Sequence, residues 1–364
     1  MKRGMNDAAV GSGRLVRESA SPSLKLLYLG ESSGTSRHRF EALRRLGHEV
    51  RLVEPRTAFF HNAWLGAWAF KTGSFGLEAL IHNYVRREIG DDRFDVVWID
   101  NGEFVGNALA KRLKAHAPVV LCHNLDNPFV ARDGWRWRLL RDALPVYDLF
   151  VTPRVSSAQS AARAGARRTL RAVQSADEVA HLVTDSRKTA SLDVVFVGSW
   201  MPERGPFLAR LLERGVPLQI YGPNWHKAPE FANLSPVTTC GHHGDEAYAE
   251  ILSRAKIALC LLSEGNQDLH TTRSLEIPSV GAMLCAPRTT DHLQMYHDGV
   301  EACFFNNAEQ CASLCLELLG DDERRDAIGR RGHKRALANG HFNERLCRDV
   351  LAAALISRNA QIDG

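Results

Sequence analysis

Short apolar runs alternate along the chain with longer runs in which apolar side chains recur every three or four residues. The alternation begins with LKLLYLG at residues 24–30 and returns with FDVVWID, PVVLCH and YDLFVTP. Strands that are apolar along their whole length are typical of a parallel sheet whose two faces are covered by helices. The first half of the chain therefore predicts a Rossmann-like α/β domain.

The same alternation starts again after a polar stretch over residues 174–191, which shows no strand pattern. The new apolar runs are DVVFVG, PLQIYG, KIALCLL and AMLCAP. A restart of this kind predicts a second doubly wound domain, joined to the first by a linker. We expect the two domains over 23–174 and 190–342, a disordered tail over 1–22, and a closing helix over 343–364.

Composition and charge narrow the class of protein. Apolar residues make up 45% of the chain and charged residues 24%, and no window approaches the run of about 18 apolar residues that spans a bilayer. The formal charge of +4 is small and the basic residues are dispersed, which argues against nucleic-acid binding and favours small anions as partners. Residues 1–22 contain no apolar segment of signal-peptide type. We therefore expect a cytoplasmic protein without an integral membrane segment.

The eight cysteines contain no CxxC pair, and several lie inside apolar strand-like runs. Cys311 and Cys315 share one helix face at i, i+4, but no histidine stands near them at ligand spacing. Buried free thiols in a reducing compartment explain this usage better than disulfides or zinc. We predict no metal site.

One carboxylate interrupts an otherwise apolar helix that is expected to begin at Thr272 and to stop at Gly281. Glu276 lies one turn inside this helix, among residues that face a core. A buried carboxylate requires hydrogen-bond donors, and the two adjacent hydroxyls of a ribose would supply them. A local ion pair with Arg273, three residues earlier, is the alternative.

Each expected domain opens with a strand that ends in glycine, Gly30 in the first and Gly198 in the second. A glycine there lets the backbone approach a ligand, and the free amides of the following helix favour an anion. Neither loop reads GxGxxG, so the dinucleotide fingerprint is absent and a plain tight turn is the alternative. Arg204 follows Gly198 by six residues and offers planar donors to a diphosphate, or is a solvated arginine beside Glu203.

His123 closes the apolar run PVVLCH and is followed by Asn124, Asp126 and Asn127. Polar residues at the carboxyl end of a first-domain strand would face the same cleft as Gly198, although a single histidine is often structural. A second polar group, His242 and His243 before Asp245, is better explained by Asp245 as a helix N-cap than by a metal.

The segment FFHNAWLGAWAF places Phe60, Trp64 and Trp68 on one face of a helix. We expect this face to pack against the core or the other domain. An acceptor-binding lip and a peripheral contact with a membrane surface are the alternatives.

Three ordered stretches of the second half, FVGSWMPERGPFLARLLERGVPLQIYGPNW, KIALCLL and TTRSLEIPSVGAMLCAPRTTDHLQMYHDGVEACFF, cover most of residues 193–306. They resemble the CgeB-like branch of the GT-B glycosyltransferases, named for a spore maturation protein. The first half is similar more weakly, through YLGESSGTSRHRFEALRRLGHEV, HNLDNPF and YDLFVTPRV. The resemblance implies two Rossmann-like domains that face a central cleft, with residues 343–364 crossing back to the first domain.

The resemblance also implies roles for residues. Glu276 would hold the ribose hydroxyls of a nucleotide-diphosphate sugar, while Arg204 and the amides around Gly198 would meet the diphosphate. The donor-binding positions so implied are Gly198, Ser199, Arg204, Tyr221, Gly222, Thr272, Arg273 and Glu276. The catalytic positions are His123, which would touch the donor sugar, Arg204 and Asp268.

Two departures from the wider group bear on these roles. Ser199 follows Gly198 where that group often has an arginine, so Arg204 alone supplies charge there. Asp268 stands eight positions before Glu276 where the group has a second, longer glutamate. This departure leaves the sugar unassigned.

The sequence thus predicts a hexosyltransferase-like GT-B enzyme that moves a sugar from a nucleotide-diphosphate donor to an acceptor hydroxyl. The acceptor, whether glycan, protein or small molecule, is not identified. The family likeness implies retention of anomeric configuration and independence of a metal, with the nucleotide sugar as a substrate and no tightly bound cofactor. A sugar-nucleotide epimerase of the same fold, or a non-catalytic saccharide- or nucleotide-binding protein of a cell-surface assembly, are the alternatives.

Overall fold

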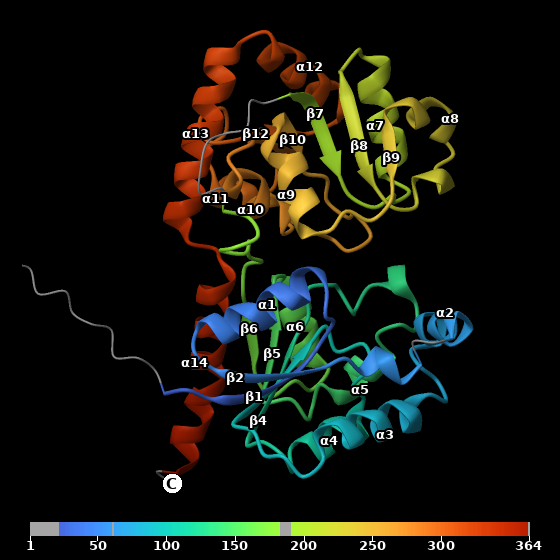
Figure 1. The fold of residues 1–364 in the computed structure, drawn as a ribbon, viewed down its shortest axis with the longest axis vertical. Coiled ribbons are helices and arrows are strands. Elements are labelled where there is room, and N and C mark those ends of the chain that lie inside the picture. The colour runs from blue at the N-terminus through green and yellow to red at the C-terminus, as the bar shows by residue number, and fades with distance from the viewer. Residues whose placement is uncertain (1–21, 60–61, 183–190, 363–364) are drawn as a thin grey trace, which may run out of the picture.

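The computed structural model describes residues 22–59, 62–182 and 191–362, with side chains up to Ile356. The expected tail over 1–22 therefore lies almost wholly outside the described residues, as do Phe60 and part of the expected linker. The described chain forms two α/β units that lie one above the other (Figure 1).

The first unit is a six-stranded parallel sheet in the order β2-β1-β3-β4-β5-β6. Its strands are β1 (Lys25–Leu29), β2 (Glu49–Val53), β3 (Val96–Asp100), β4 (Val119–His123), β5 (Leu149–Thr152) and β6 (Thr169–Arg171). Its helices are α1 (Gly34–Arg45), α2 (Ala63–Thr72), α3 (Glu78–Ile89), α4 (Asn107–Leu113), α5 (Arg138–Ala143) and α6 (Val155–Arg163), with short 3₁₀ turns at η1 (Pro55–Ala58) and η2 (Ala131–Asp133).

The second unit is another six-stranded parallel sheet, in the order β12-β11-β10-β7-β8-β9. Its strands are β7 (Leu192–Val197), β8 (Leu218–Gly222), β9 (Thr238–Cys240), β10 (Ala255–Leu259), β11 (Met283–Pro287) and β12 (Cys303–Phe305). The later helices are α7 (Arg204–Glu213), α8 (Phe231–Leu234), α9 (Asp245–Ser253), α10 (Arg273–Ser279), α11 (Thr290–Met295), α12 (Ala308–Leu319), α13 (Asp322–Asn339) and α14 (Asn343–Ile362), with 3₁₀ turns at η3 (Trp225–Lys227) and η4 (Ser235–Val237). Two doubly wound parallel sheets confirm the expected fold class.

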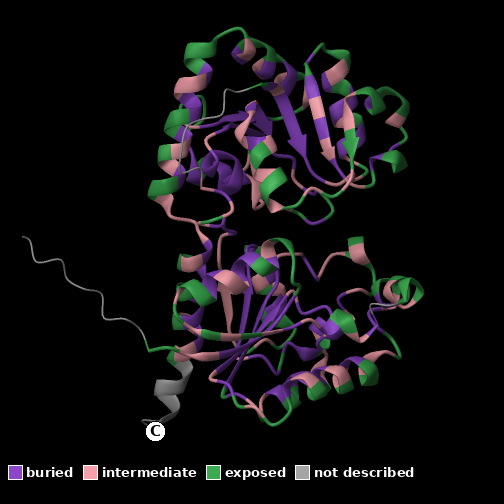
Figure 2. Ribbon diagram, viewed as in Figure 1, coloured by how far each residue is buried: buried purple, intermediate pink, exposed green. Residues whose placement is uncertain are grey.

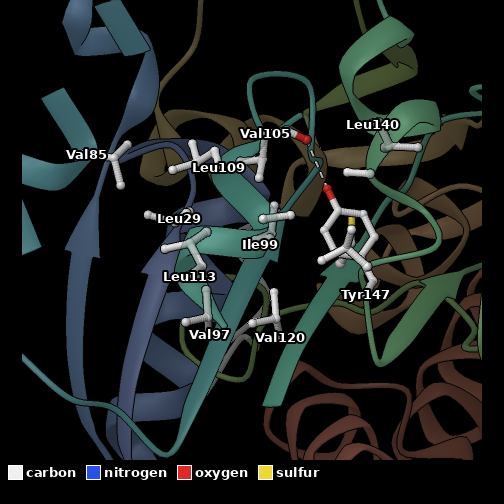
Figure 3. Packing of buried hydrophobic residues seen from close by; sticks show 14 of the residues in the cluster. Leu29, Val85, Val97, Ile99, Val105, Leu109, Leu113, Val120, Leu140 and Tyr147 are labelled. Atoms are coloured by element: carbon white, nitrogen blue, oxygen red, sulfur yellow. Dashed lines mark hydrogen bonds between the residues drawn. The ribbon is translucent and has the colours of Figure 1, made fainter. Parts of the chain in front are cut away.

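The central strands are buried because helices cover both faces of each sheet, as Figure 2 shows by the purple strands, whereas the edge strands β2, β6 and β9 are largely intermediate or exposed. All five residues of β3 and all five of β4 are buried. On one face of the first sheet, Val97, Ile99 and Val120 pack against side chains of α3, α4 and α5 (Figure 3). Tyr147 belongs to this cluster and donates its hydroxyl to the Val105 carbonyl oxygen at 3.1 Å, which satisfies its buried polar atom.

The last helix, α14, belongs by its packing to the first unit. It follows α13 of the second unit and then runs along the first sheet beside α1 (Figure 1). Leu346, Cys347 and Val350 of α14 are buried in one cluster with Leu26 and Trp98 of the first sheet. The helix completes the cover of a sheet face that α1 covers only in part.

The carboxyl ends of the two sheets face each other, because the loops that follow the strands of one sheet contact those of the other. Asn127, after β4, donates its backbone N–H to Oδ1 of Asn266, after β10, at 2.7 Å. Arg171, at the end of β6, forms an ion pair of 2.8 Å with Asp291 of α11. A crevice of about 210 Å³ opens between these loops, lined on one side by Arg154 and Arg171 and on the other by His270 and Asp291. Ligands of doubly wound folds bind at such carboxyl ends.

Within the described residues, no helix combines the length and the apolar character that crossing a bilayer would require.

Candidate active site

The loop after β7 is held in a tight approach to the end of β8. The Gly198 N–H donates to the Tyr221 carbonyl oxygen at 2.8 Å, and Trp225 donates its indole N–H to the Gly198 carbonyl oxygen at 2.9 Å. A Cβ on Gly222 would lie 2.2 Å from that same oxygen, and Gly222 has a φ of +144°. Gly222 is therefore required by the backbone geometry that shapes the Gly198 loop.

Arg204 is buried beneath this loop with 5% of its surface exposed, so the idea of a solvated helix-end arginine is wrong. Its Nη1 donates to the Ser199 carbonyl oxygen at 2.9 Å and its Nη2 to the Leu261 carbonyl oxygen at 3.2 Å. Among the described residues no carboxylate oxygen lies within 4.0 Å of the guanidinium, and Nε has no hydrogen-bond partner. Burial, with repulsion from Arg273, lowers the pKa of Arg204 to about 10. No described carboxylate pairs directly with Arg204, although the more distant charges of Glu203 and Asp268 oppose the fall in its pKa.

Arg273 reaches the same loop from α10. Its Nε donates to the carbonyl oxygen of Val197 at 2.6 Å, so the side chain binds β7 and not Glu276, and the local ion pair is not formed. Arg204 and Arg273 thus bind the carbonyl oxygens on either side of Gly198. Two guanidinium groups beside one glycine loop make a strongly cationic setting for an anion.

The start of α10 is fixed by a buried histidine. His292 Nδ1 lies 2.6 Å from the Pro287 carbonyl oxygen, which only accepts, so Nδ1 carries the proton and Nε2 accepts from the Ser274 hydroxyl at 2.8 Å. The Thr271 N–H donates to Oγ of Ser274 at 3.1 Å. Burial lowers the pKa of His292 to about 4, which keeps the ring neutral in this role.

Glu276 is buried, with 4% of its surface exposed. The Tyr248 hydroxyl donates to its Oε2 at 2.5 Å, while its Oε1 lies 3.9 Å from Nε2 of His181 and accepts no hydrogen bond from the described residues. The Asp177 N–H donates to Nδ1 of His181 at 2.9 Å, which places the proton of a neutral ring on Nε2, toward Glu276. One carboxylate oxygen is thus satisfied by the protein and the other retains acceptor capacity.

His123 lies at the tip of the first sheet, directly beside Asp100 in the strand register. It is 1% exposed, its ring contacts Trp98 edge-on, and its Nδ1 is buried without a hydrogen-bond partner. Burial, assisted by repulsion from Arg39 and opposed by Asp100, lowers the pKa of His123 to about 3. The histidine is therefore a neutral group at the cleft-facing end of its strand.

Asp268 lies between the two units and is bound from both. Its carboxylate forms an ion pair with Arg154 of the first unit and accepts from Nδ2 of Asn266 at 3.0 Å. Arg154 also donates to the Leu125 carbonyl oxygen at 2.6 Å. In this arrangement Asp268 joins the two units, and a sugar hydroxyl would have to compete with Arg154 for it.

The polar groups of Tyr221 and Thr272 described below bond to other groups of the second unit. Tyr221 donates its hydroxyl to Gln219 at 3.0 Å, and its ring contacts His243. Thr272 makes no side-chain cap, and its carbonyl oxygen accepts the N–H of Glu276 at 2.8 Å. Five of the expected positions lie at the loop after β7: Gly198, Ser199, Arg204, Gly222 and Arg273. Thr272 and Glu276 lie at the start of α10. His123 lies at the carboxyl end of β4 in the first unit, and Asp268 lies between the two units.

Two structural expectations were wrong. Gly244, and not Asp245, is the N-cap of α9, and the Asp245 carboxylate lies 3.1 Å from Nε2 of His38 in α1. Trp64 and Trp68 do not pack into a core, since they are 86% and 51% exposed. In both cases, what contacts the side chain depends on segments that are distant in the sequence.

The structure adds Cys285 to the cysteine pair seen in the sequence. The Sγ atoms of Cys285, Cys311 and Cys315 lie within 4.8 Å of one another, between β11 and α12. Among the described residues, these three cysteines are close enough together to hold a metal ion. All three belong to the apolar core of the second sheet, where free thiols pack as small apolar groups.

Sequence reasoning missed Arg154, Tyr248 and His181. Arg154 stands at the end of the YDLFVTPRV stretch, two residues past β5, and an arginine at a strand end was an available signal. Tyr248 and His181 carried none, because their contact with Glu276 joins segments that are 28 and 95 residues away in sequence.

Comparisons with known proteins bear on the family and on the fold. Residues 204–352 match a family model described as glycosyl transferase-like. The sequence matches no curated protein. Among solved structures, HepE from Anabaena in complex with UDP-glucose is similar with a TM-score of 0.64 at 14% identity, over 92% of this chain and 100% of that chain.

Two further structures have similar scores. Sucrose-phosphate synthase from Thermosynechococcus elongatus has a TM-score of 0.65 at 13% identity, over 93% of this chain and 100% of that chain. An E. coli structure described as trehalose-6-phosphate bound with UDP-2-fluoro glucose has a TM-score of 0.62 at 11% identity, over 91% and 98%. The chain therefore has the GT-B fold, and its residues 204–352 are similar to a glycosyl transferase-like family.

Proposed function

We propose that this chain transfers a sugar from a nucleotide-diphosphate donor to an acceptor hydroxyl. The observation that carries the proposal is Arg204, a buried cation that faces carbonyl oxygens and no carboxylate, with Arg273 beside it. Buried charge without a partner is costly, and an anion bound at the loop would offset that cost. A diphosphate fits because two planar guanidinium groups can each bind two of its oxygens.

The remaining second-domain groups suit the rest of such a donor. Oε1 of Glu276 would accept a ribose hydroxyl, while Tyr248 keeps the carboxylate oriented. The Gly198 and Trp200 N–H groups already donate to the carbonyl oxygens of Tyr221 and Pro223, so in this loop the Ser199 N–H would bind a phosphate oxygen near the start of α7. The UDP-glucose complex of HepE and the UDP-2-fluoro glucose complex from E. coli support a uridine-based donor, and both have the same fold.

In this proposal the chemistry is stabilisation of the leaving diphosphate. Negative charge develops on the leaving phosphate oxygen as the glycosidic bond breaks, and Arg204, Arg273 and the loop amide are already fixed around that position. His123, neutral at physiological pH, would contact the donor sugar, and Asp268, once released from Arg154, would contact a sugar hydroxyl. Retention of configuration and independence of a metal are part of the proposal through the family resemblance.

Calorimetric titration with UDP, UDP-glucose and the corresponding GDP, ADP and dTDP sugars tests the donor. We expect a uridine donor to bind and to be hydrolysed slowly without acceptor. Glu276→Gln should weaken donor binding by about tenfold, the order of 1–2 kcal/mol for a lost charge-assisted hydrogen bond. Glu317→Gln, an exposed carboxylate of α12 paired with Arg324, is the matched control and should change nothing. Absence of binding and of hydrolysis with every nucleotide sugar would contradict the proposal.

Product analysis separates the other activities. Interconversion of donor epimers without transfer would identify an epimerase, and donor binding with no turnover in the presence of cell extract would identify a binding protein. Mass spectrometry of a cell extract incubated with a labelled donor should reveal the acceptor if transfer occurs.

A further inference from the structure

The first domain exposes five large aromatic side chains on neighbouring segments. Trp64, Trp68 and Phe70 of α2 are 86%, 51% and 48% exposed, Phe75 is 65% exposed, and Trp135 is 64% exposed. We call these five residues the aromatic surface. Monomeric proteins seldom leave so many large rings in water without a binding purpose.

Contacts between the segments show that these rings belong to one region. The Trp68 indole N–H donates to the Phe75 carbonyl oxygen at 2.9 Å. A Cβ on Gly73 would lie 2.1 Å from the Trp135 carbonyl oxygen, so the α2–α3 turn and the segment before α5 are in direct contact. Arg138 also donates to the Gly73 carbonyl oxygen, at 3.1 Å.

Two polar side chains of this region, Asn62 and Thr72, are engaged with its own backbone, and the Ser74 hydroxyl is fully buried. Asn62 accepts the N–H groups of Trp64 and Leu65 at 3.0 and 3.3 Å as the cap of α2. The Thr72 hydroxyl donates to the Trp68 carbonyl oxygen and accepts from the Phe75 N–H. A glycan needs free hydrogen-bonding groups beside aromatic rings, whereas a lipid interface does not.

A basic hollow lies next to the aromatic surface. It has a volume of about 920 Å³ and is lined by η1, α3 and α4, with Arg86, Arg87 and Arg112 among its residues and Asp91 as its acid. Burial lowers the pKa of His82 beside it, and the positive charges of Arg112 and Arg86 lower it further. Leu80, 44% exposed, lines the same hollow one turn into the helix that follows Phe75.

The segment from η1 to the residue before α3 carries no negatively charged side chain. Residues 55–77 contain no Asp or Glu, and Lys71 is exposed between Phe70 and the turn. Exposed aromatic rings, exposed arginines and the lack of Asp and Glu over residues 55–77 together match a membrane surface, where tryptophan occupies the headgroup region and arginine binds lipid phosphates.

We propose that this face of the first domain binds the surface of a membrane that contains anionic lipids. The aromatic surface enters the interface, and the arginines of the hollow bind phosphate headgroups. Such binding would hold the protein at the membrane through its first domain. The inference does not rest on the proposed transfer reaction, since vesicle binding is measured without donor or acceptor.

Sedimentation with vesicles tests it. The whole chain should bind vesicles of phosphatidylcholine mixed with phosphatidylglycerol, and should bind pure phosphatidylcholine vesicles about tenfold more weakly, because polybasic and apolar contributions add. The double variant Trp64→Ser with Trp68→Ser should lose at least about tenfold in affinity for the mixed vesicles. Arg86→Glu with Arg87→Glu should abolish the preference for the anionic lipid.

The variant Leu316→Ser is the control, because Leu316 is an exposed apolar residue of α12 in the second domain. It should bind vesicles as the unchanged protein does. Far-UV circular dichroism should be unaltered in all variants, since every substituted side chain is exposed, and the single variant Trp64→Ser, which keeps the Trp68–Phe75 hydrogen bond, should also bind the mixed vesicles more weakly. Failure of the unchanged protein to bind mixed vesicles, or undiminished binding by the tryptophan variant, would overturn the proposal; capture of a soluble glycan by the same tryptophans would overturn it as well.

Discussion

A buried arginine follows the first strand of each domain, and the two arginines have opposite surroundings. Arg39 of α1 is 3% exposed and donates from Nε and Nη2 to both oxygens of Asp100 at 2.9 Å. Arg204 of α7 is 5% exposed and donates to backbone carbonyl oxygens alone. Burial alone would lower the pKa of both arginines. The charge of Asp100 outweighs burial and raises the pKa of Arg39, whereas the positive charge of Arg273 adds to the effect of burial and the pKa of Arg204 falls.

If the proposed function holds, the difference separates a structural charge from a charge held for a ligand. The first domain neutralises its arginine internally and thereby fixes α1 against β3. The second domain leaves the equivalent positive charge unneutralised at a glycine loop. Related folds can thus use the same residue type at the same topological place for stability in one domain and for binding in the other. Four experiments test this contrast.

The largest effect is expected from Arg39→Met. Removing one member of a fully buried ion pair leaves Asp100 unpaired, so the free energy of unfolding should fall by about 3–5 kcal/mol. Urea unfolding followed by circular dichroism measures it. An unchanged unfolding midpoint would show that Asp100 does not depend on Arg39.

Arg204→Met should give the opposite pattern. Stability should stay the same or rise, because the variant removes an unneutralised buried charge and keeps most of the volume. Transfer from a uridine donor should fall by about 10²–10³ in kcat/KM, the size seen when a fixed charge-stabilising donor is lost. Arg210→Met, which breaks a surface pair on the same helix, serves as the control. Loss of stability with full activity would remove the distinction between the two arginines.

Mild acid should affect both domains through their buried neutral histidines. The pKa of His123 is lowered to about 3 and that of His292 to about 4. Because each folded-state pKa lies below the ordinary value of about 6.5, the stability that the neutral ring provides is complete above that value. It is lost as the pH falls toward the folded pKa, by about 2 kcal/mol per histidine between pH 7 and pH 5.

Urea unfolding at the two pH values measures this loss. The variants His123→Gln and His292→Gln should each flatten the pH dependence. If both variants lose as much free energy of unfolding between pH 7 and pH 5 as the unchanged protein, other titratable groups cause the loss.

The smallest effect is expected at the interdomain pair. Arg154→Met leaves Asp268 without its ion-pair partner, and separation of the domains lets water reach the carboxylate. We expect the balance between closed and open forms to shift by about 1 kcal/mol, which small-angle scattering would detect as a larger radius of gyration. Saturating donor should reverse the change if the crevice closes on it. A radius that does not differ from that of the unchanged protein would exclude a latch at this position.

The sheets could be predicted from the sequence because their central strands are buried on both faces and read as continuous apolar runs. The runs FDVVWID and KIALCLL are examples, and they form β3 and β10. Glu276 could be singled out for a related reason, since a carboxylate stands out among the apolar neighbours of a buried helix. Its burial follows from the same pattern, but its partner Tyr248 does not.

Contacts between domains could not be predicted, because they depend on the placement of two rigid units. The Arg154–Asp268 pair spans 114 residues, and His38 meets Asp245 across the same interface. Spacing also failed for Trp64 and Trp68. A periodicity of i, i+4 identifies an apolar helix face but not what covers it, so a face left open to solvent has the same pattern as a core face.

The position of α14 has a consequence for how the protein matures. Ribosomes deliver the amino-terminal sheet first, yet Leu26 and Trp98 gain their cover of Cys347 and Val350 only after the whole second unit has emerged. The first unit therefore keeps part of its apolar sheet face exposed to solvent until the second unit has been synthesised. Pulse proteolysis of stalled nascent chains should find the first unit protected only once α14 has emerged, so an expression clone that ends before α14 should give an unstable first unit.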